Sequence, residues 1–90
     1  MIEVRRTGPG AFTVTIREGD SETRHQVTLS EADCARLGGG DTPEALVEAA
    51  FRFLLDREPK ESILRRFDLT VISRYFPEFE RELPRYLAQR

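Results

Sequence analysis

Apolar and polar residues alternate along residues 1–30, with turn-forming residues at two points. The apolar side of the pattern consists of Ile2, Val4, Phe12, Val14, Ile16, His25, Val27 and Leu29. A period of two predicts strands with one buried and one solvated face, and the glycines near Pro9 and Asp20 predict tight turns between them. We therefore expect a three-stranded antiparallel meander.

A helical pattern replaces this alternation after Ser30, which has the residue type that caps a short helix. Thr42 and Pro43 predict the start of a longer helix, because threonine is a good cap and proline fits the first helical position. Polar residues occupy one arc of this helix and apolar residues the rest, so the helix should pack on the sheet and on a second element. Phe51 and Leu55 fall at the edge of the polar arc.

Shorter helices are expected in residues 59–90. One covers Lys60–Phe67, a second runs from Asp68 or Thr70 through Phe76, and a third carries Phe79, Leu83 and Tyr86 and is kinked or ended by Pro84. The predicted fold class is α+β: a three-stranded antiparallel sheet with C-terminal helices on one face. The chain is short enough to form a single domain over residues 1–90, with strands in residues 1–30 and helices in residues 31–90.

The composition favours a cytoplasmic protein. Cys34 is the only cysteine, so no intramolecular disulfide can form. The longest apolar region, residues 45–55, is interrupted by Glu48 and Arg52, and this argues against a membrane span. The net charge is −2, but residues 59–90 carry seven basic and five acidic side chains, which points weakly to an acidic partner.

The sequence offers little for catalysis or for cofactor binding. His25 is the only histidine, and one histidine with one cysteine cannot build a structural zinc site. No nucleophile motif accompanies His25, which we place at the margin of the core. The glycines at positions 38–40 lack the lysine of a phosphate-binding loop. We expect no enzyme activity, no cofactor and no metal.

Aromatic residues and arginines are interleaved from Pro59 to Arg90. This segment is either the second half of the core or a surface that binds a partner. The candidate partner-binding residues are Arg65, Arg66, Arg74, Tyr75 and Arg81. An alternative interpretation makes Leu64–Tyr75 a helix-turn-helix that binds DNA, although DNA-binding domains are usually more basic.

Two resemblances bear on function. Residues 58–67, continuing into Arg74-Tyr75-Phe76-Pro77, resemble a group of short bacterial proteins with no assigned function. Residues 2–56 resemble the sheet and first helix of HicB-type antitoxins, which implies binding to a small RNA-cleaving toxin. The helix expected after Ser30 and the aromatic C-terminal segment depart from that antitoxin pattern.

The sequence thus predicts a non-enzymatic protein-interaction or regulatory module, with an antitoxin-like role as one form of it. A small DNA-binding protein is the alternative. A protein partner is expected, nucleic acid less so, and a homodimer through Phe51 and Leu55 is the rival to a C-terminal segment that covers both. Partner identity, oligomeric state and pathway stay open.

Overall fold

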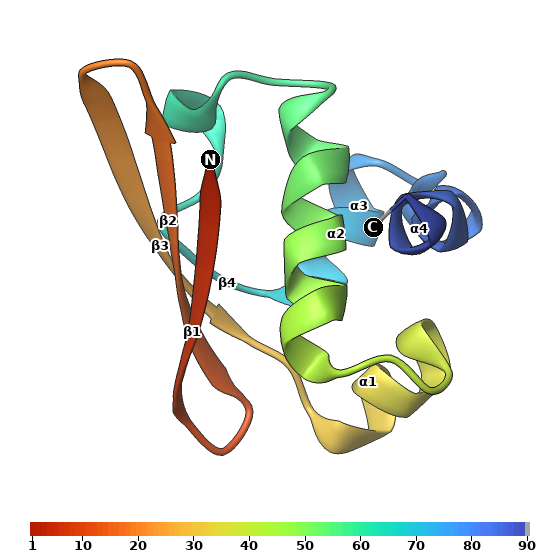
Figure 1. Ribbon diagram of the computed structural model, residues 1–90. Helices are drawn as coiled ribbons and strands as arrows, with labels where there is room; N and C mark the ends of the chain where they lie inside the picture. Colours follow the sequence, from red (N-terminus) through yellow and green to blue (C-terminus); the bar gives the residue numbers. More distant parts are fainter. Residues whose placement is uncertain (90) are drawn as a thin grey trace.

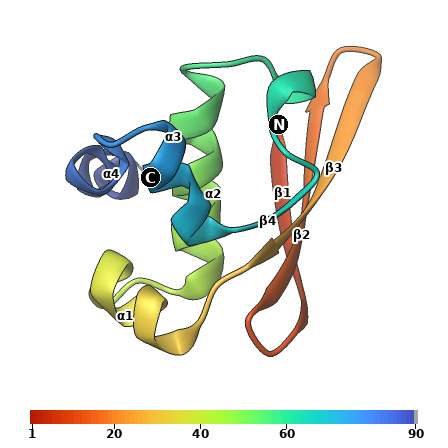
Figure 2. The same cartoon turned by 180° about the vertical axis from the view of Figure 1, so that it is seen from behind.

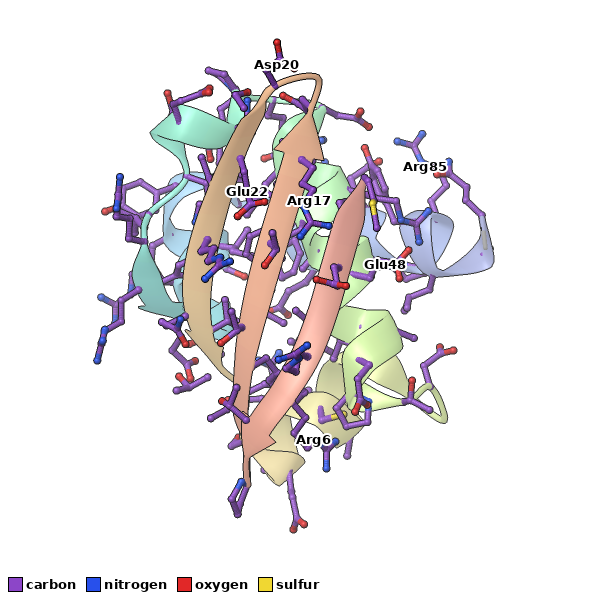
Figure 3. All side chains as sticks on the ribbon, turned by 60° about the vertical axis from the view of Figure 1, so that its left-hand side comes forward. Arg6, Arg17, Asp20, Glu22, Glu48 and Arg85 are labelled. Atoms are coloured by element: carbon purple, nitrogen blue, oxygen red, sulfur yellow. The ribbon has the colours of Figure 1, made fainter. Side chains whose placement is uncertain are left out.

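The computed structural model describes residues 1–89 and has an α+β fold in three layers (Figure 1). A four-stranded mixed sheet forms the first layer, the long helix α2 (Pro43–Leu55) lies against one of its faces, and the C-terminal helices lie beyond α2. The other face of the sheet carries charged side chains such as Arg17 and Glu22 (Figure 3).

The first three strands form the predicted antiparallel meander. They are β1 (Ile2–Gly8), β2 (Ala11–Glu18) and β3 (Ser21–Thr28). Val14 of β2 lies between Val4 and His25, so the apolar positions of the three strands share one face. Gly10 turns the chain between β1 and β2 with φ of +65°, and a Cβ there would come within 2.9 Å of the Leu29 carbonyl oxygen.

A fourth strand, β4 (Arg66–Asp68), corrects the prediction of a purely antiparallel three-stranded sheet. It lies beside β3 (Figure 2) and pairs with it in parallel. In this pairing Phe67 is opposite Val27. The spacing of Leu64 and Phe67 suggested a helix, but Leu64 is exposed, and the buried residues Phe67 and Leu69 alternate as in a strand. The expected Lys60–Phe67 helix is only a 3₁₀ turn, η1 (Lys60–Ser62).

The two helices in the middle of the chain begin where the sequence predicts. In α1 (Glu31–Gly38), the amide of Asp33 donates to Ser30 Oγ at 3.1 Å. In α2, the amide of Ala45 donates to Thr42 Oγ1 at 3.1 Å. Each side-chain oxygen satisfies an amide that has no partner within its helix.

Of the C-terminal helices, the one expected before Phe76 is shorter than the sequence suggested, and the one that contains Pro84 is not interrupted there. After β4 come a 3₁₀ turn, η2 (Leu69–Val71), and a single turn of α-helix, α3 (Ile72–Tyr75). Helix α4 (Phe79–Ala88) continues through Pro84, which was expected to kink or end it. Buried Leu83, Tyr86 and Leu87 hold both halves of α4 in place, and this packing outweighs the missing amide of the exposed proline.

Helix α2 presents aromatic rings to both neighbouring layers. Toward the sheet, the Phe51 ring centroid lies 5.5 Å from that of His25 and 5.8 Å from that of Phe67. Toward α4, the Phe53 ring lies 5.1 Å from Phe79 and 5.7 Å from Tyr86. Phe51 has no exposed surface and contacts Phe67, so the C-terminal segment contributes to its cover as predicted, and Phe51 offers no surface to the rival homodimer.

We expect Phe53→Ala to be severely destabilising, because it removes the ring on which the aromatic residues of the third layer converge. Truncating a buried phenylalanine costs about 3–5 kcal/mol, a large part of the roughly 5–15 kcal/mol of a typical domain. Urea denaturation measures the loss. Leu64→Ala is the matched control, since 47% of Leu64 is exposed, and a similar loss in both variants would contradict this account of the core.

Candidate functional site

The segment from Leu64 to Phe76 carries most of the candidate residues, and Asp68 fixes its path. Thr28 Oγ1 on β3 donates to Asp68 Oδ1 at 2.6 Å, and the amide and hydroxyl of Thr70 donate to Asp68 Oδ2 at 3.1 and 2.6 Å. Burial opposes the ionisation of Asp68, but the bonds from Thr28 and Thr70 outweigh it and lower the carboxyl pKa. The carboxylate therefore joins the end of β4 both to the sheet and to the turn that follows.

An apolar hollow of about 180 Å³ opens between this segment and the end of α2. The lining residues are Leu54, Glu58, Ser62, Ile63, Leu64, Phe67, Val71, Ile72, Tyr75 and Phe76. Tyr75 is 66% exposed and Leu64 is 47% exposed; besides Met1, they are the large apolar side chains that residues 1–89 leave open to solvent. Both belong to this hollow, so its rim is apolar where it meets water.

Glu58 is the ionisable group of the lining. Its side chain is half-buried and makes no hydrogen bond or salt bridge with another of residues 1–89. Burial raises the pKa of this carboxyl above its ordinary value, because the charged form loses hydration. A ligand in the hollow could donate a hydrogen bond to it.

Three of the candidate arginines have no counter-ion in the part of the chain that the structure describes. Arg65, Arg66 and Arg74 are exposed, and none of them forms a salt bridge with another described residue. Arg65 follows Leu64 and Arg74 precedes Tyr75, so each is next in the chain to an exposed residue of the rim. Arg66 alternates with the buried Phe67 in β4 and points to the opposite side of the strand.

Arg81 lies apart from the other candidates. It belongs to α4, which contributes no residue to the hollow. Its side chain is 77% exposed, and its Nε is 3.9 Å from a carboxylate oxygen of Glu82. Of the candidate residues, Tyr75 lines the hollow, whereas Arg65, Arg66 and Arg74 are each next in the chain to a lining residue and Arg81 lies outside it.

The helix-turn-helix of the alternative interpretation, over Leu64–Tyr75, is not formed. Its first helix is replaced by β4, and its second shrinks to the 3₁₀ turn η2 and the single turn of α3. The reason is the pairing with β3: the amide of Gln26 donates to the Arg65 carbonyl at 2.7 Å, which holds this stretch extended.

His25 is buried, with 1% of its surface exposed, and this corrects its expected place at the margin of the core. Its Nδ1 lies 2.8 Å from the Leu64 carbonyl oxygen, so Nδ1 carries the proton and donates. Its Nε2 then accepts from the Thr23 hydroxyl at 2.9 Å. Burial lowers the His25 pKa; the bond to Leu64 opposes the shift, and the positive charge of Arg65 adds to it.

Lys60 is a second buried group that the sequence did not reveal. Its side chain is 4% exposed, and its Nζ donates to Glu61 at 2.8 Å and to Glu18 at 3.1 Å. The hydrogen bond to Glu61 is the main cause of a raised Lys60 pKa. The amine ties η1 to the end of β2, so its role is to position the chain that leads into the hollow.

The described residues show little metal-binding or nucleophilic chemistry. Residues 1–89 contain no group of three or more histidine, cysteine, aspartate or glutamate side chains that could hold a metal ion. Cys34 is free and half-buried. Among the same residues, no helix combines the length and the apolar character that crossing a bilayer requires.

Known proteins add nothing to this picture: no family model, no curated protein and no solved structure matches the chain. The hollow and its rim are therefore the features of the structure from which a function can be proposed. The sequence singled out Tyr75, Arg65 and Arg74, but it gave no indication that Glu58 and Leu64 line a common hollow with Tyr75. The weak signal for Leu64 was its position in the chain: it is apolar, but it does not continue the every-second-residue pattern of the buried residues Phe67 and Leu69.

We expect the stability of the protein to fall as the pH drops below about 6.5, the ordinary histidine pKa. The folded state holds His25 neutral with a lowered pKa, so the unfolded chain binds the proton first and is stabilised by it. Above about pH 7.5 this contribution is constant. Urea denaturation between pH 5 and 8 measures the dependence.

His25→Gln is the matched variant for this pH dependence. Glutamine can still donate to the Leu64 carbonyl but loses the ring contact with Phe51, so we expect a loss of about 1–3 kcal/mol at pH 8. The difference between wild type and variant should shrink on acidification. A constant difference from pH 8 to pH 5 would show that His25 does not titrate on unfolding.

Proposed function

We propose that the protein is a non-enzymatic interaction module that binds a segment of a partner protein in the hollow between α2 and residues 62–76. The observation that carries the proposal is an apolar hollow with an exposed apolar rim, to which Arg65 and Arg74, without a salt bridge among residues 1–89, are next in the chain. Exposed apolar patches bordered by polar residues are typical of interaction sites.

The chemistry of the hollow defines what the partner segment must offer. Leu54, Ile63 and Phe76 favour an apolar side chain in the hollow, and the exposed Tyr75 ring offers a large contact area at low entropic cost. Arg65 and Arg74 favour carboxylates on either side of that apolar anchor. The half-buried Glu58 favours a hydrogen-bond donor close to it.

A regulatory role is part of the proposal. The likeness of residues 2–56 to HicB-type antitoxins makes a small RNA-cleaving toxin one partner to test, and the hollow lies mostly outside those residues. DNA binding is the competing hypothesis, because an arginine side chain binds phosphate as well as carboxylate. Protein binding and DNA binding can be distinguished by two measurements: which positions of the chain contact the partner, and how strongly binding depends on salt.

We expect a photo-reactive amino acid at position 75 to crosslink one protein in cells, because Tyr75 stands at the open rim of the hollow. The same group at position 81 is the control, since Arg81 is also exposed but lies outside the hollow. The readout is mass spectrometry of the crosslinked species. Equal labelling from both positions, or none from position 75, would rule out the hollow as the binding site.

We expect Arg65→Glu combined with Arg74→Glu to weaken binding of that protein at least about tenfold, because like charges would then face its carboxylates. Arg81→Glu changes charge outside the hollow and should leave affinity within about twofold. Titration calorimetry measures both. If the wild type instead binds random duplex DNA with a steep salt dependence that the double variant abolishes, DNA binding replaces protein binding as the function.

A further inference from the structure

Strand β1 has an open edge. It is the outermost strand of the sheet and pairs only with β2 (Figure 3). At its start, the amide of Arg17 donates to the Met1 carbonyl at 2.9 Å, and the Met1 amino group donates to the Arg17 carbonyl at 2.8 Å. Met1 and Arg17 are thus a hydrogen-bonded pair, and along an antiparallel ladder such pairs alternate with pairs that form no hydrogen bond to each other. Glu3 and Arg5 accordingly bond to β2, whereas the residues that alternate with them do not. The backbone groups of Ile2, Val4 and Arg6 therefore point to the open edge.

The side chains of β1 differ between its two faces. Ile2 and Val4 are half-buried and pack against the core. Glu3 and Arg5 are exposed on the solvent face, and neither forms a salt bridge with another of residues 1–89. Charges on an edge strand commonly prevent association with other strands. Here the two charges have opposite sign and are two residues apart, so they can also complement a second strand.

We propose that two copies of the chain form a dimer by antiparallel pairing of their β1 edges, centred on Val4. In this register Val4 exchanges backbone hydrogen bonds with Val4 of the second copy, and Ile2 does so with Arg6. Glu3 of each copy lies directly opposite Arg5 of the other. These are non-hydrogen-bonded positions, where opposite side chains approach each other most closely.

The register is self-complementary, and this favours a second copy over an unrelated strand. A two-fold axis through the midpoint between the two Val4 residues generates both Glu3–Arg5 pairs at once, and such an isologous contact closes after two chains. The axis is perpendicular to the sheet, so the helical layers of both copies lie on one face of a continuous sheet. Ile2 and Val4, now half-buried, lose further contact with water.

Charge reversal tests the register. Analytical ultracentrifugation should show a wild-type dimer, and Glu3→Arg or Arg5→Glu alone should raise its dissociation constant about tenfold or more, because each creates two like-charge pairs. An equimolar mixture of the two single variants should form a heterodimer, since each strand then faces one of opposite charge. The double variant Glu3→Arg with Arg5→Glu should restore the homodimer.

Asp20→Arg is the matched control, because it changes the net charge as Glu3→Arg does but lies at the β2–β3 turn (Figure 3). It should leave the dissociation constant unchanged. Far-UV circular dichroism verifies that the single variants fold. A wild-type protein that stays monomeric at about 1 mM overturns the proposal, and so does a dimer that the single reversals do not weaken.

Discussion

Burial of α2 on two opposite sides is the constraint on which the rest of the structure depends. Phe51 faces the sheet and Phe53 faces α4, and neither has exposed surface. A single sheet can cover only one side of such a helix, so the C-terminal segment has to form a third layer. Where that layer meets the end of α2, its packing is incomplete, and the hollow lined by Leu54 and Phe76 results.

Arg57 is a half-buried charged group with several partners. Arg57 stacks over Phe53 with its Cζ 3.6 Å from the ring centroid, and donates to Glu78 at 3.1 Å and to the Tyr86 hydroxyl at 3.3 Å. Burial opposes the charge of Arg57, but its bonds to Tyr86 and Glu78 outweigh this and raise its pKa. Among residues 1–89, Arg65 and Arg74 have no such partners, and this contrast marks them as residues available to a ligand.

Local patterns predicted the parts of the fold that depend on neighbours in sequence. The meander followed from alternation through Val14 and Ile16, and both helix starts followed from the caps Ser30 and Thr42. The strand β4 could not be predicted in this way, because its three residues become a strand only by pairing with β3. Pro84 misled for the same reason: long-range packing decides whether a helix continues through a proline.

The candidate site was predictable in composition but not in geometry. The clustering of aromatic residues and arginines indicated Tyr75 and the arginines, yet the sequence could not separate Arg65 and Arg74 from Arg81. Only the fold distinguishes them, because residues 62–76 border the hollow and α4, which carries Arg81, does not. Glu58 gave no signal, because a glutamate after a helix is ordinary until an apolar wall forms beside it.

The parallel pairing of β3 with β4 has a kinetic consequence. Thr28 and Asp68, which join the two strands, are 40 residues apart in sequence, whereas the β1–β3 meander closes through short turns. Contacts of long sequence separation carry a larger loop-closure cost and tend to form late in folding. The meander should therefore fold first and the hollow last. By the same reasoning, amide protection against hydrogen exchange should be weakest along β4 and α3, beside the hollow.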